Sequence, residues 1–241
     1  MEEVRKSLAS RFLLFIAPLV KFIDIKLSVP YYKKKVHGGH YFLWRDRIDE
    51  GTVFLTNTLG PGSNLINPSD INHSAIYFGK GLRTYLETLM EAHKENLELV
   101  GRWKKIIKDY DVRDDIRYVI EAVGQGVVPT DLVSFLTTKD LVIGKKATFC
   151  SSDLSMDASR VAVYDLGKKY DYSFSHAEDT KYCFEVCADA FENTVQGKKL
   201  KRVEYKIFGF KVHDTFLSDT FQTSDWETVF DSENVKDKHL G

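Results

Sequence analysis

The chain has few cysteines and no excess of either charge, and each shortage excludes a class of protein. Three cysteines occur among 241 residues, and they are too few and too irregularly spaced for a disulfide framework or a zinc finger. We therefore expect a reducing, cytoplasmic environment. The formal net charge of −1 argues against a broad nucleic-acid-binding surface, because such surfaces carry a basic excess. Peptides, small molecules or lipids are the predicted partners, and no nucleic acid.

The N-terminal segment lacks an apolar run long enough to cross a membrane. The run at 12–20 has nine residues, whereas a membrane-spanning helix needs about 20. Glu2 and Glu3 make the segment a poor signal peptide. We expect residues 1–44 to form an amphipathic helix and a linker, and two interpretations stay open. The helix either lies on a membrane surface, with Lys33–Lys35 near anionic headgroups, or packs on the rest of the protein.

Hydrophobic periodicity predicts strands and helices in mixed order, without regular strand–helix alternation. This order favours the α+β class over a parallel α/β sheet. Strands are expected at 51–56, 74–78, 116–123, 141–149 and 203–212. Helices are expected at 82–108, at 130–137 with Thr130 as its cap, at 157–166, and from Cys183 onwards with Thr180 or Asp179 as its cap.

The segment Tyr182–Cys187 is the most informative part of the chain, because it opens a helix with a cysteine in the first turn. The unpaired N–H groups and the dipole of a helix N-terminus stabilise the thiolate form of such a side chain. His73 precedes the predicted strand 74–78. A cysteine at a helix start and a histidine at a strand start can meet as a nucleophile and its base. We therefore predict a cysteine-dependent hydrolase or acyl-transfer enzyme.

Five short motifs occur along the chain in a characteristic order. They are Gly51–Leu55, Asn72–Gly79, Val119–Ala122, Gly167–Phe174 and Tyr182–Val186. With its motifs in this order, the sequence resembles the circularly permuted NlpC-type papain-like proteins of the YaeF/YiiX group, relatives of lecithin retinol acyltransferase, in which the strands come first and the cysteine helix last. The resemblance covers residues from about 45 to 195.

The resemblance implies a permuted papain-like fold, in which an antiparallel sheet packs against the cysteine-bearing helix. It places the catalytic domain at 45–197, with a helical insertion at 82–115. The remaining residues, 198–241, are then a C-terminal extension packed on the same domain.

The resemblance also implies roles for four residues. Cys183 would be the nucleophile and His73 the general base. Glu121 would orient the imidazole and stabilise its cationic form. Tyr170 would donate a hydrogen bond near the oxyanion, beside the backbone N–H of Cys183. This chemistry needs no metal and no other cofactor.

Several residues compete for these roles. His176 is an alternative base, and Asp171 and Glu185 are alternative carboxylates, although Glu185 fits a helix cap or ion-pair partner better. Glu121 either faces inward as the third member or outward by strand alternation. The other two cysteines, Cys150 and Cys187, are expected to be structural.

The sequence departs from the family pattern in three places. Phe184 stands where a serine is usual, Thr52 stands where an aspartate is usual, and the insertion is long enough to be a lid or a partner surface.

We expect the bond attacked to be an amide, ester or thioester in a peptide, a cell-wall peptide or a lipid. Two alternatives are a catalytically inactive lipid- or peptide-binding module and an interaction protein that works through the helical segment 82–108.

Overall fold

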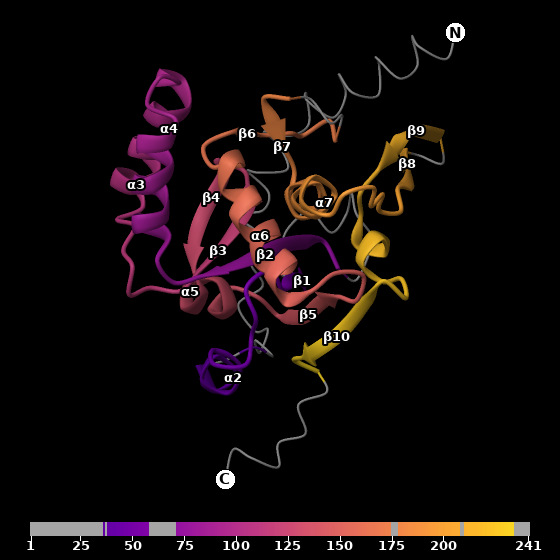
Figure 1. Cartoon of the computed structure of the whole chain (residues 1–241). Coiled ribbons are helices and arrows are strands. Elements are labelled where there is room, and N and C mark those ends of the chain that lie inside the picture. Colours follow the sequence, from indigo (N-terminus) through magenta and orange to yellow (C-terminus); the bar gives the residue numbers. More distant parts are fainter. Residues whose placement is uncertain (1–35, 37, 58–70, 175–177, 208–209, 234–241) are drawn as a thin grey trace, which may run out of the picture.

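A six-stranded antiparallel sheet organises the molecule (Figure 1). The computed structural model describes residues 36, 38–57, 71–174, 178–207 and 210–233. The strand order is β10–β5–β1–β2–β3–β4. The six strands are β1 (Val53–Asn57), β2 (His73–Gly79), β3 (Tyr118–Val123), β4 (Gly126–Asp131), β5 (Leu141–Ala147) and β10 (Trp226–Asp231).

Helices cover both faces of this sheet, and two short strand pairs lie outside it. The helices are α2 (Gly38–Trp44), α3 (Leu82–Ala92), α4 (Leu97–Asp109), α5 (Leu132–Thr137), α6 (Ser152–Ala162), α7 (Cys183–Thr194) and the short 3-10 helices η2 (Val163–Asp165) and η3 (Ser218–Phe221). The small pairs are β6 (Lys169–Tyr170) with β7 (Thr180–Lys181) and β8 (Val203–Ile207) with β9 (Phe210–Thr215).

Two apolar clusters hold the sheet between its helices. Alternate strand residues face opposite sides, so Leu55 and Ile76 join the cluster that includes α6 and α7, whereas Phe54 and Tyr77 join the one that includes α2 and α5. Because both faces are covered, β1 is buried along its whole length. The helix that begins at Cys183 packs directly on β2 in this arrangement (Figure 1).

A glycine permits the close approach of α6 to the sheet. Gly51 has a φ of +85°, and a Cβ atom there would lie 1.9 Å from the backbone oxygen of Ser155 in α6. Only glycine combines this backbone conformation with that contact. Since α6 also packs against α7, Gly51 contributes indirectly to the placement of the cysteine helix.

Strand β4 was not predicted, and the cap assigned to Thr130 is wrong. Thr130 lies in β4, and Asp131 caps α5 by accepting a hydrogen bond from the backbone N–H of Ser134 at 2.9 Å. The prediction took Pro129 as the residue before a helix start. However, β4 is an edge strand of the sheet, where proline is tolerated.

The predicted helix 82–108 is wrong as one element, because it consists of α3 and α4. Asn96 ends the break between them, since its side chain accepts a hydrogen bond from the N–H of Leu99 at 3.1 Å and so starts a new helix. The helix predicted at 157–166 begins earlier, at Ser152, where the Ser151 side chain is the cap.

The C-terminal part contains more regular structure than predicted. The strand expected at 203–212 is the hairpin β8–β9, and β10 was not predicted at all. Thr180 belongs to β7 and does not cap α7, whose N-cap residue is Tyr182. The amphipathic helix expected within 1–44 falls almost entirely outside the described residues, apart from α2. Every helix in the described part of the chain is too short or too polar to cross a membrane.

Candidate active site

Cys183 is the first residue of α7, and its sulfur lies among hydrogen-bond donors. The side chain of His73 and the backbone N–H groups of Ser74 and Phe184 are the neighbours that stabilise the anionic form of this sulfur. Burial raises the pKa of the Cys183 thiol, but these hydrogen bonds and the charge of His73 outweigh burial and lower it. The site therefore favours the thiolate. Cys183 is 2% exposed.

Cys187 lies one turn further along α7 and is chemically different. Its sulfur donates a hydrogen bond to the hydroxyl of Ser74 at 3.6 Å. Burial raises the pKa of Cys187 far above its ordinary value. Cys187 is therefore a protonated core residue, as the sequence predicts.

His73 is the first residue of β2 and links Cys183 to Glu121. Its Nε2 atom lies 2.6 Å from Oε2 of Glu121, and its ring also hydrogen-bonds the sulfur of Cys183. Burial and the nearby charge of Lys139 lower the pKa of His73, but the hydrogen bonds to Cys183 and Glu121 raise it above its ordinary value overall. The imidazole is thus placed to hold a proton next to a thiolate.

Glu121 faces inward from β3, and only 5% of its side chain is exposed. Strand register explains this position, because Glu121 pairs with Ala75, two residues after His73 on the same side of β2. Its second oxygen, Oε1, accepts a hydrogen bond from the hydroxyl of Thr130 at 2.5 Å. Burial raises the pKa of Glu121, but His73, Lys139 and Thr130 together lower it to about 2. The carboxylate is therefore ionised.

Tyr170 approaches the sulfur from β6. Its hydroxyl forms a hydrogen bond with Cys183, and burial together with the charge of Cys183 raises the pKa of Tyr170 well above its ordinary value. Tyr170 therefore stays protonated as a hydrogen-bond donor beside the sulfur. The structure thus brings the four sequence-predicted residues together from three strands and one helix.

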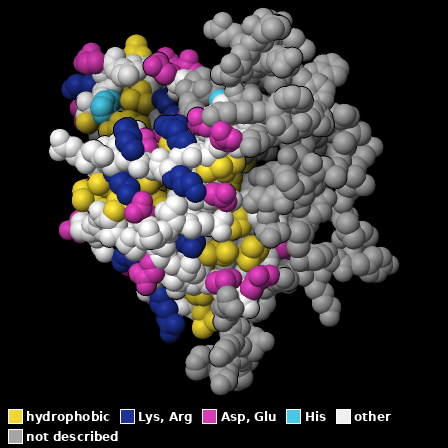
Figure 2. Space-filling model, turned by 90° about the vertical axis from the view of Figure 1, so that its right-hand side faces the viewer, with side chains coloured by type: hydrophobic (Ala, Val, Ile, Leu, Met, Phe, Trp, Pro, Cys, Tyr) yellow, Lys and Arg dark blue, Asp and Glu magenta, His cyan; other side chains and the backbone are white. Residues whose placement is uncertain are grey.

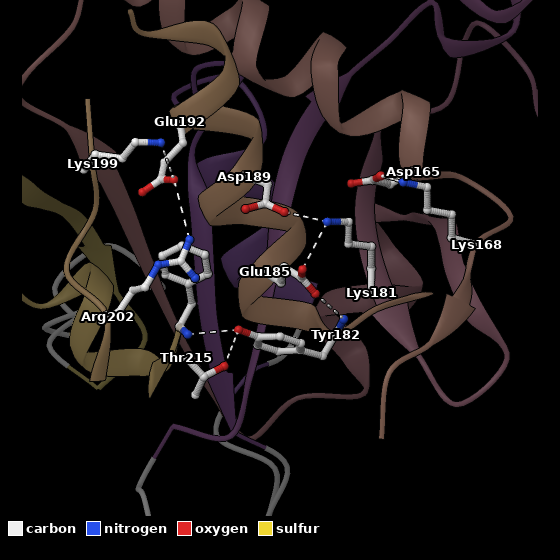
Figure 3. A network of polar contacts seen from close by, with 11 residues as sticks. Asp165, Lys168, Lys181, Tyr182, Glu185, Asp189, Glu192, Lys199, Arg202 and Thr215 are labelled. Atoms are coloured by element: carbon white, nitrogen blue, oxygen red, sulfur yellow. Dashed lines mark hydrogen bonds and ion pairs between the residues drawn. The ribbon is translucent and has the colours of Figure 1, made fainter. Parts of the chain in front are cut away.

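Glu185 serves the start of α7, not His73. It accepts a hydrogen bond from the N–H of Tyr182 at 3.5 Å and pairs with Lys181 at 3.1 Å (Figure 3). Lys181 also contacts Asp189 one turn later, at 2.5 Å. These contacts tie the residues before Cys183 to the first turns of the helix.

The Tyr182 side chain anchors the same helix start to the C-terminal part of the chain. Its hydroxyl lies 2.5 Å from the hydroxyl of Thr215 and accepts a hydrogen bond from the N–H of Phe216 at 2.9 Å (Figure 3). These bonds are buried. The residue next to the nucleophile candidate is therefore held by β9 and the segment that follows it.

The remaining competitors have other positions. Asp171 accepts hydrogen bonds from the backbone N–H and the hydroxyl of Ser173, at 2.8 and 2.6 Å, as in an Asx turn. His176 falls outside the described residues. The hydroxyl of Ser155 lies 3.4 Å from the sulfur of Cys150.

The departures from the family pattern leave the four side chains in place. Phe184 is buried and stacks on Phe221 with ring centroids 6.3 Å apart. Thr52 donates a hydrogen bond to the backbone oxygen of Asp49 at 2.7 Å. Helices α3 and α4 lie at the left edge of the molecule in Figure 1, whereas α7 lies near its centre. Neither the bulky neighbour nor the insertion therefore prevents the four side chains from lying together.

Sequence reasoning missed two residues that contact Glu121. Thr130 was assigned to a helix cap, although a strand through 126–131 would have placed it across from β3. Lys139 lies in the loop between α5 and β5, with Nζ 3.8 Å from Oε2 of Glu121. No pattern in the sequence around Lys139 indicates this contact, because it depends on how the loop packs against the sheet.

The described surface shows no single-sign charge field on the face seen in Figure 2. Lysine and arginine side chains alternate there with acidic ones, and apolar side chains lie between them. This mixture agrees with the near-zero net charge. It gives no continuous basic track of the kind that follows a nucleic-acid backbone.

The chain is similar to known proteins in both sequence and fold. A family model described as permuted papain-like amidase enzyme, YaeF/YiiX, C92 family, matches residues 47–236. Among solved structures, the chain is similar to the crystal structure of metalloprotein yiiX from Escherichia coli O157:H7, DUF1105, with a TM-score of 0.52 and 17% sequence identity. The match covers 76% of this chain and 96% of that chain. At this identity the likeness shows a shared fold. No curated protein matches this chain in sequence.

The description of that neighbour as a metalloprotein raises the question of a metal site here. Within the described residues, no group of three or more His, Cys, Asp and Glu side chains could hold a metal ion. At the site itself, both oxygens of Glu121 already contact His73, Thr130 and Lys139. The donor set of the described site does not fit a metal, and we assign none of its residues to one.

Proposed function

Because this chain belongs to the YaeF/YiiX (C92) family of permuted papain-like amidase enzymes, we propose that it is a thiol-dependent amidase with Cys183 as its nucleophile. The predicted family resemblance is confirmed. So is the predicted α+β fold with an antiparallel sheet packed against the cysteine helix. The substrate and the roles of individual residues are the proposal.

One observation carries this proposal: the His73 imidazole contacts the ionised carboxylate of Glu121 and also interacts with the thiol of Cys183. The Nε2 atom of His73 lies 2.6 Å from Oε2 of Glu121. These interactions shift both pKa values in the direction that catalysis requires, because the pKa of the thiol is lowered and the pKa of the imidazole is raised. A buried structural cysteine shows the opposite direction, as Cys187 does.

The proposed reaction begins when the Cys183 thiolate attacks the carbonyl carbon of an amide. A carbon–sulfur bond forms, and the carbonyl oxygen gains negative charge that the N–H of Cys183 and the hydroxyl of Tyr170 stabilise. The His73 imidazolium then gives its proton to the nitrogen as the carbon–nitrogen bond breaks, and the amine leaves. Water then gives a proton to His73 and attacks the thioester carbon, and the carbon–sulfur bond breaks to release the carboxylic acid and to restore the Cys183 thiolate beside the His73 imidazolium. Glu121 keeps the imidazole oriented throughout.

Labelling with iodoacetamide at mildly acidic pH tests the nucleophile. An ordinary thiol is almost entirely protonated there, so a thiolate held by an imidazolium reacts selectively. We expect wild type and Cys150→Ala to be labelled at position 183 and Cys183→Ala to lose that label. Equal labelling of the two variants would refute the assignment.

The low exposure of Cys183 favours one alternative, a catalytically inactive peptide- or lipid-binding module of the same fold. At 2% exposure, the sulfur is accessible to a substrate only if side chains around it move. The labelling experiment separates the two functions, because an inactive module would leave Cys183 unlabelled under native conditions and labelled in denaturant. If Cys183 is labelled under native conditions, turnover of amide, ester and thioester substrates by the unlabelled protein would then define the scissile bond.

The substrate class is part of the proposal. The family name favours an amide, in a peptide or a cell-wall peptide, and lipid acyl groups are the remaining class that the resemblance allows. Comparison of model amides that carry a peptide, a cell-wall peptide or a long acyl chain on the carbonyl side distinguishes them. The class with the highest kcat/KM identifies the substrate.

A further inference from the structure

Lys139 is a partly buried cation beside the carboxylate of the proposed triad. Its side chain is 12% exposed, and its Nζ lies 3.8 Å from Oε2 of Glu121. This is the same oxygen that lies 2.6 Å from Nε2 of His73. The ammonium also lies 4.8 Å from the ring centroid of Phe135. A lysine held this way has exchanged part of its hydration for one carboxylate and one aromatic face.

Two cations therefore share one carboxylate oxygen when His73 is protonated. The two nitrogens can be no farther apart than the sum of their distances to that oxygen, so the ammonium and the imidazolium repel each other at short range. Lys139 helps to keep Glu121 ionised while His73 is neutral, and it opposes the second positive charge when His73 is protonated. These two effects follow from one contact.

The other groups around this carboxylate are few and identifiable among the described residues. Thr130, from β4, bonds its other oxygen, Oε1. Two residues come from α7. Cys183 interacts with His73, and the charge of Glu121 raises the pKa of the Cys187 thiol. For His73, burial lowers the pKa most and the charge of Lys139 is the next contribution in that direction, whereas Cys183 and Glu121 raise it. Among the described residues, Lys139 is therefore the charged group that opposes protonation of His73.

We propose that Lys139 is a positioning residue that holds the Glu121 carboxylate against His73 and sets the upper pH limit of the thiolate–imidazolium pair. The inference rests on the proposed function, because it concerns the same pair. Lys139 itself does not contact the sulfur or take part in bond making. Its role is to limit how tightly His73 retains the proton that must be passed to the leaving amine.

The test compares the rate of iodoacetamide reaction at Cys183 as a function of pH in several variants. Lys139→Met keeps the apolar stem and removes the charge, and Lys139→Arg keeps the charge. The upper inflection of this profile marks loss of the imidazolium proton. We expect Lys139→Met to move it upward by about 1 pH unit, as removal of a nearby unit charge in a partly buried site predicts. Lys139→Arg should leave it near the wild-type position.

Lys146 supplies the matched control. Its Nζ also pairs with a carboxylate, that of Asp49 at 2.7 Å, but with 31% of the lysine side chain exposed. Lys146→Met should leave the profile unchanged. A folded Lys139→Met protein with a wild-type inflection, or a Lys139→Arg protein that shifts as far as Lys139→Met, would overturn the inference.

Titration of the His73 ring by NMR provides a second measurement that does not need a reactive thiol. In the Cys183→Ala background, Lys139→Met should again raise the midpoint, and an unchanged midpoint would overturn the inference. If Lys139→Met does not fold, Lys139→Gln replaces it in both assays. Failure of the proposed function is recognisable separately, since wild-type Cys183 would then lack reactivity at mildly acidic pH whatever residue 139 is.

Discussion

Replacing Glu121 with glutamine tests how much the carboxylate contributes to the reactive pair. Glutamine has nearly the same shape and can still hydrogen-bond His73, but it removes the negative charge. A hydrogen bond to a charged group contributes about 1.5–3 kcal/mol, and a neutral one about 1 kcal/mol. The difference, about 0.5–2 kcal/mol, corresponds to a fall of about 1 pH unit in the pKa of His73.

The sign of the shift follows from the structure. The hydrogen bond to Glu121 raises the pKa of His73, so removing the charge lowers it. The imidazolium then loses its proton at lower pH, and the upper inflection of the iodoacetamide profile of Glu121→Gln should move downward. This direction is opposite to that expected for Lys139→Met, although both substitutions affect contacts with the same oxygen.

Thr130→Val is the control for the loss of a hydrogen bond without loss of charge. Its hydroxyl bonds the other oxygen of Glu121, so this variant should move the inflection by less than about half a pH unit. Circular dichroism confirms folding of both variants. A folded Glu121→Gln protein whose inflection stays in place, or moves upward, would refute a role for this carboxylate in stabilising the imidazolium.

Three further predictions concern stability, each measured by urea unfolding. Tyr182→Phe leaves the buried N–H of Phe216 without its acceptor and should cost about 1–3 kcal/mol. Gly51→Ala should prevent folding or lower the free energy of unfolding by more than about 3 kcal/mol, because the Cβ would meet the α6 backbone at 1.9 Å. The control is Gly81→Ala, at a position with a φ of +78° and open space around it. It should lower the free energy of unfolding by only about 1 kcal/mol. The pKa of Glu121 is lowered to about 2 from 4.5. The ionised carboxylate should therefore contribute to the free energy of unfolding above about pH 4.5, and this contribution should be lost as the pH falls toward 2. A Glu121→Gln protein whose stability falls equally with acid would contradict this.

Local patterns predicted the elements that carry the site. The apolar stripe after Tyr182 indicated a helix, and the cysteine at its start is the first residue of α7. The β-branched and aromatic run after His73 indicated β2. Both patterns depend on residues close in sequence, and periodicity records such interactions directly. The order of the motifs then identified the permuted fold.

Predictions that depended on partners distant in sequence were less successful. The amino-acid pattern left Glu121 free to face either way, and the register of β3 against β2 decided that it faces His73, 48 residues away. Strand β10 has no strong pattern of its own and is ordered by pairing with β5. Its composition does not indicate that it forms the edge of the sheet opposite β4.

The sequence by itself determined the thiol at a helix start, the imidazole at a strand start and the order in which they occur. Only the tertiary structure decided which charges surround them, with Thr130 on one carboxylate oxygen and Lys139 on the other. The physical reason is that periodicity reports which face of an element is buried, whereas a contact between two buried polar groups depends on strand register and loop packing. The positions of Cys183 and His73 on their elements follow from the first kind of information, and their electrostatic environment follows from the second.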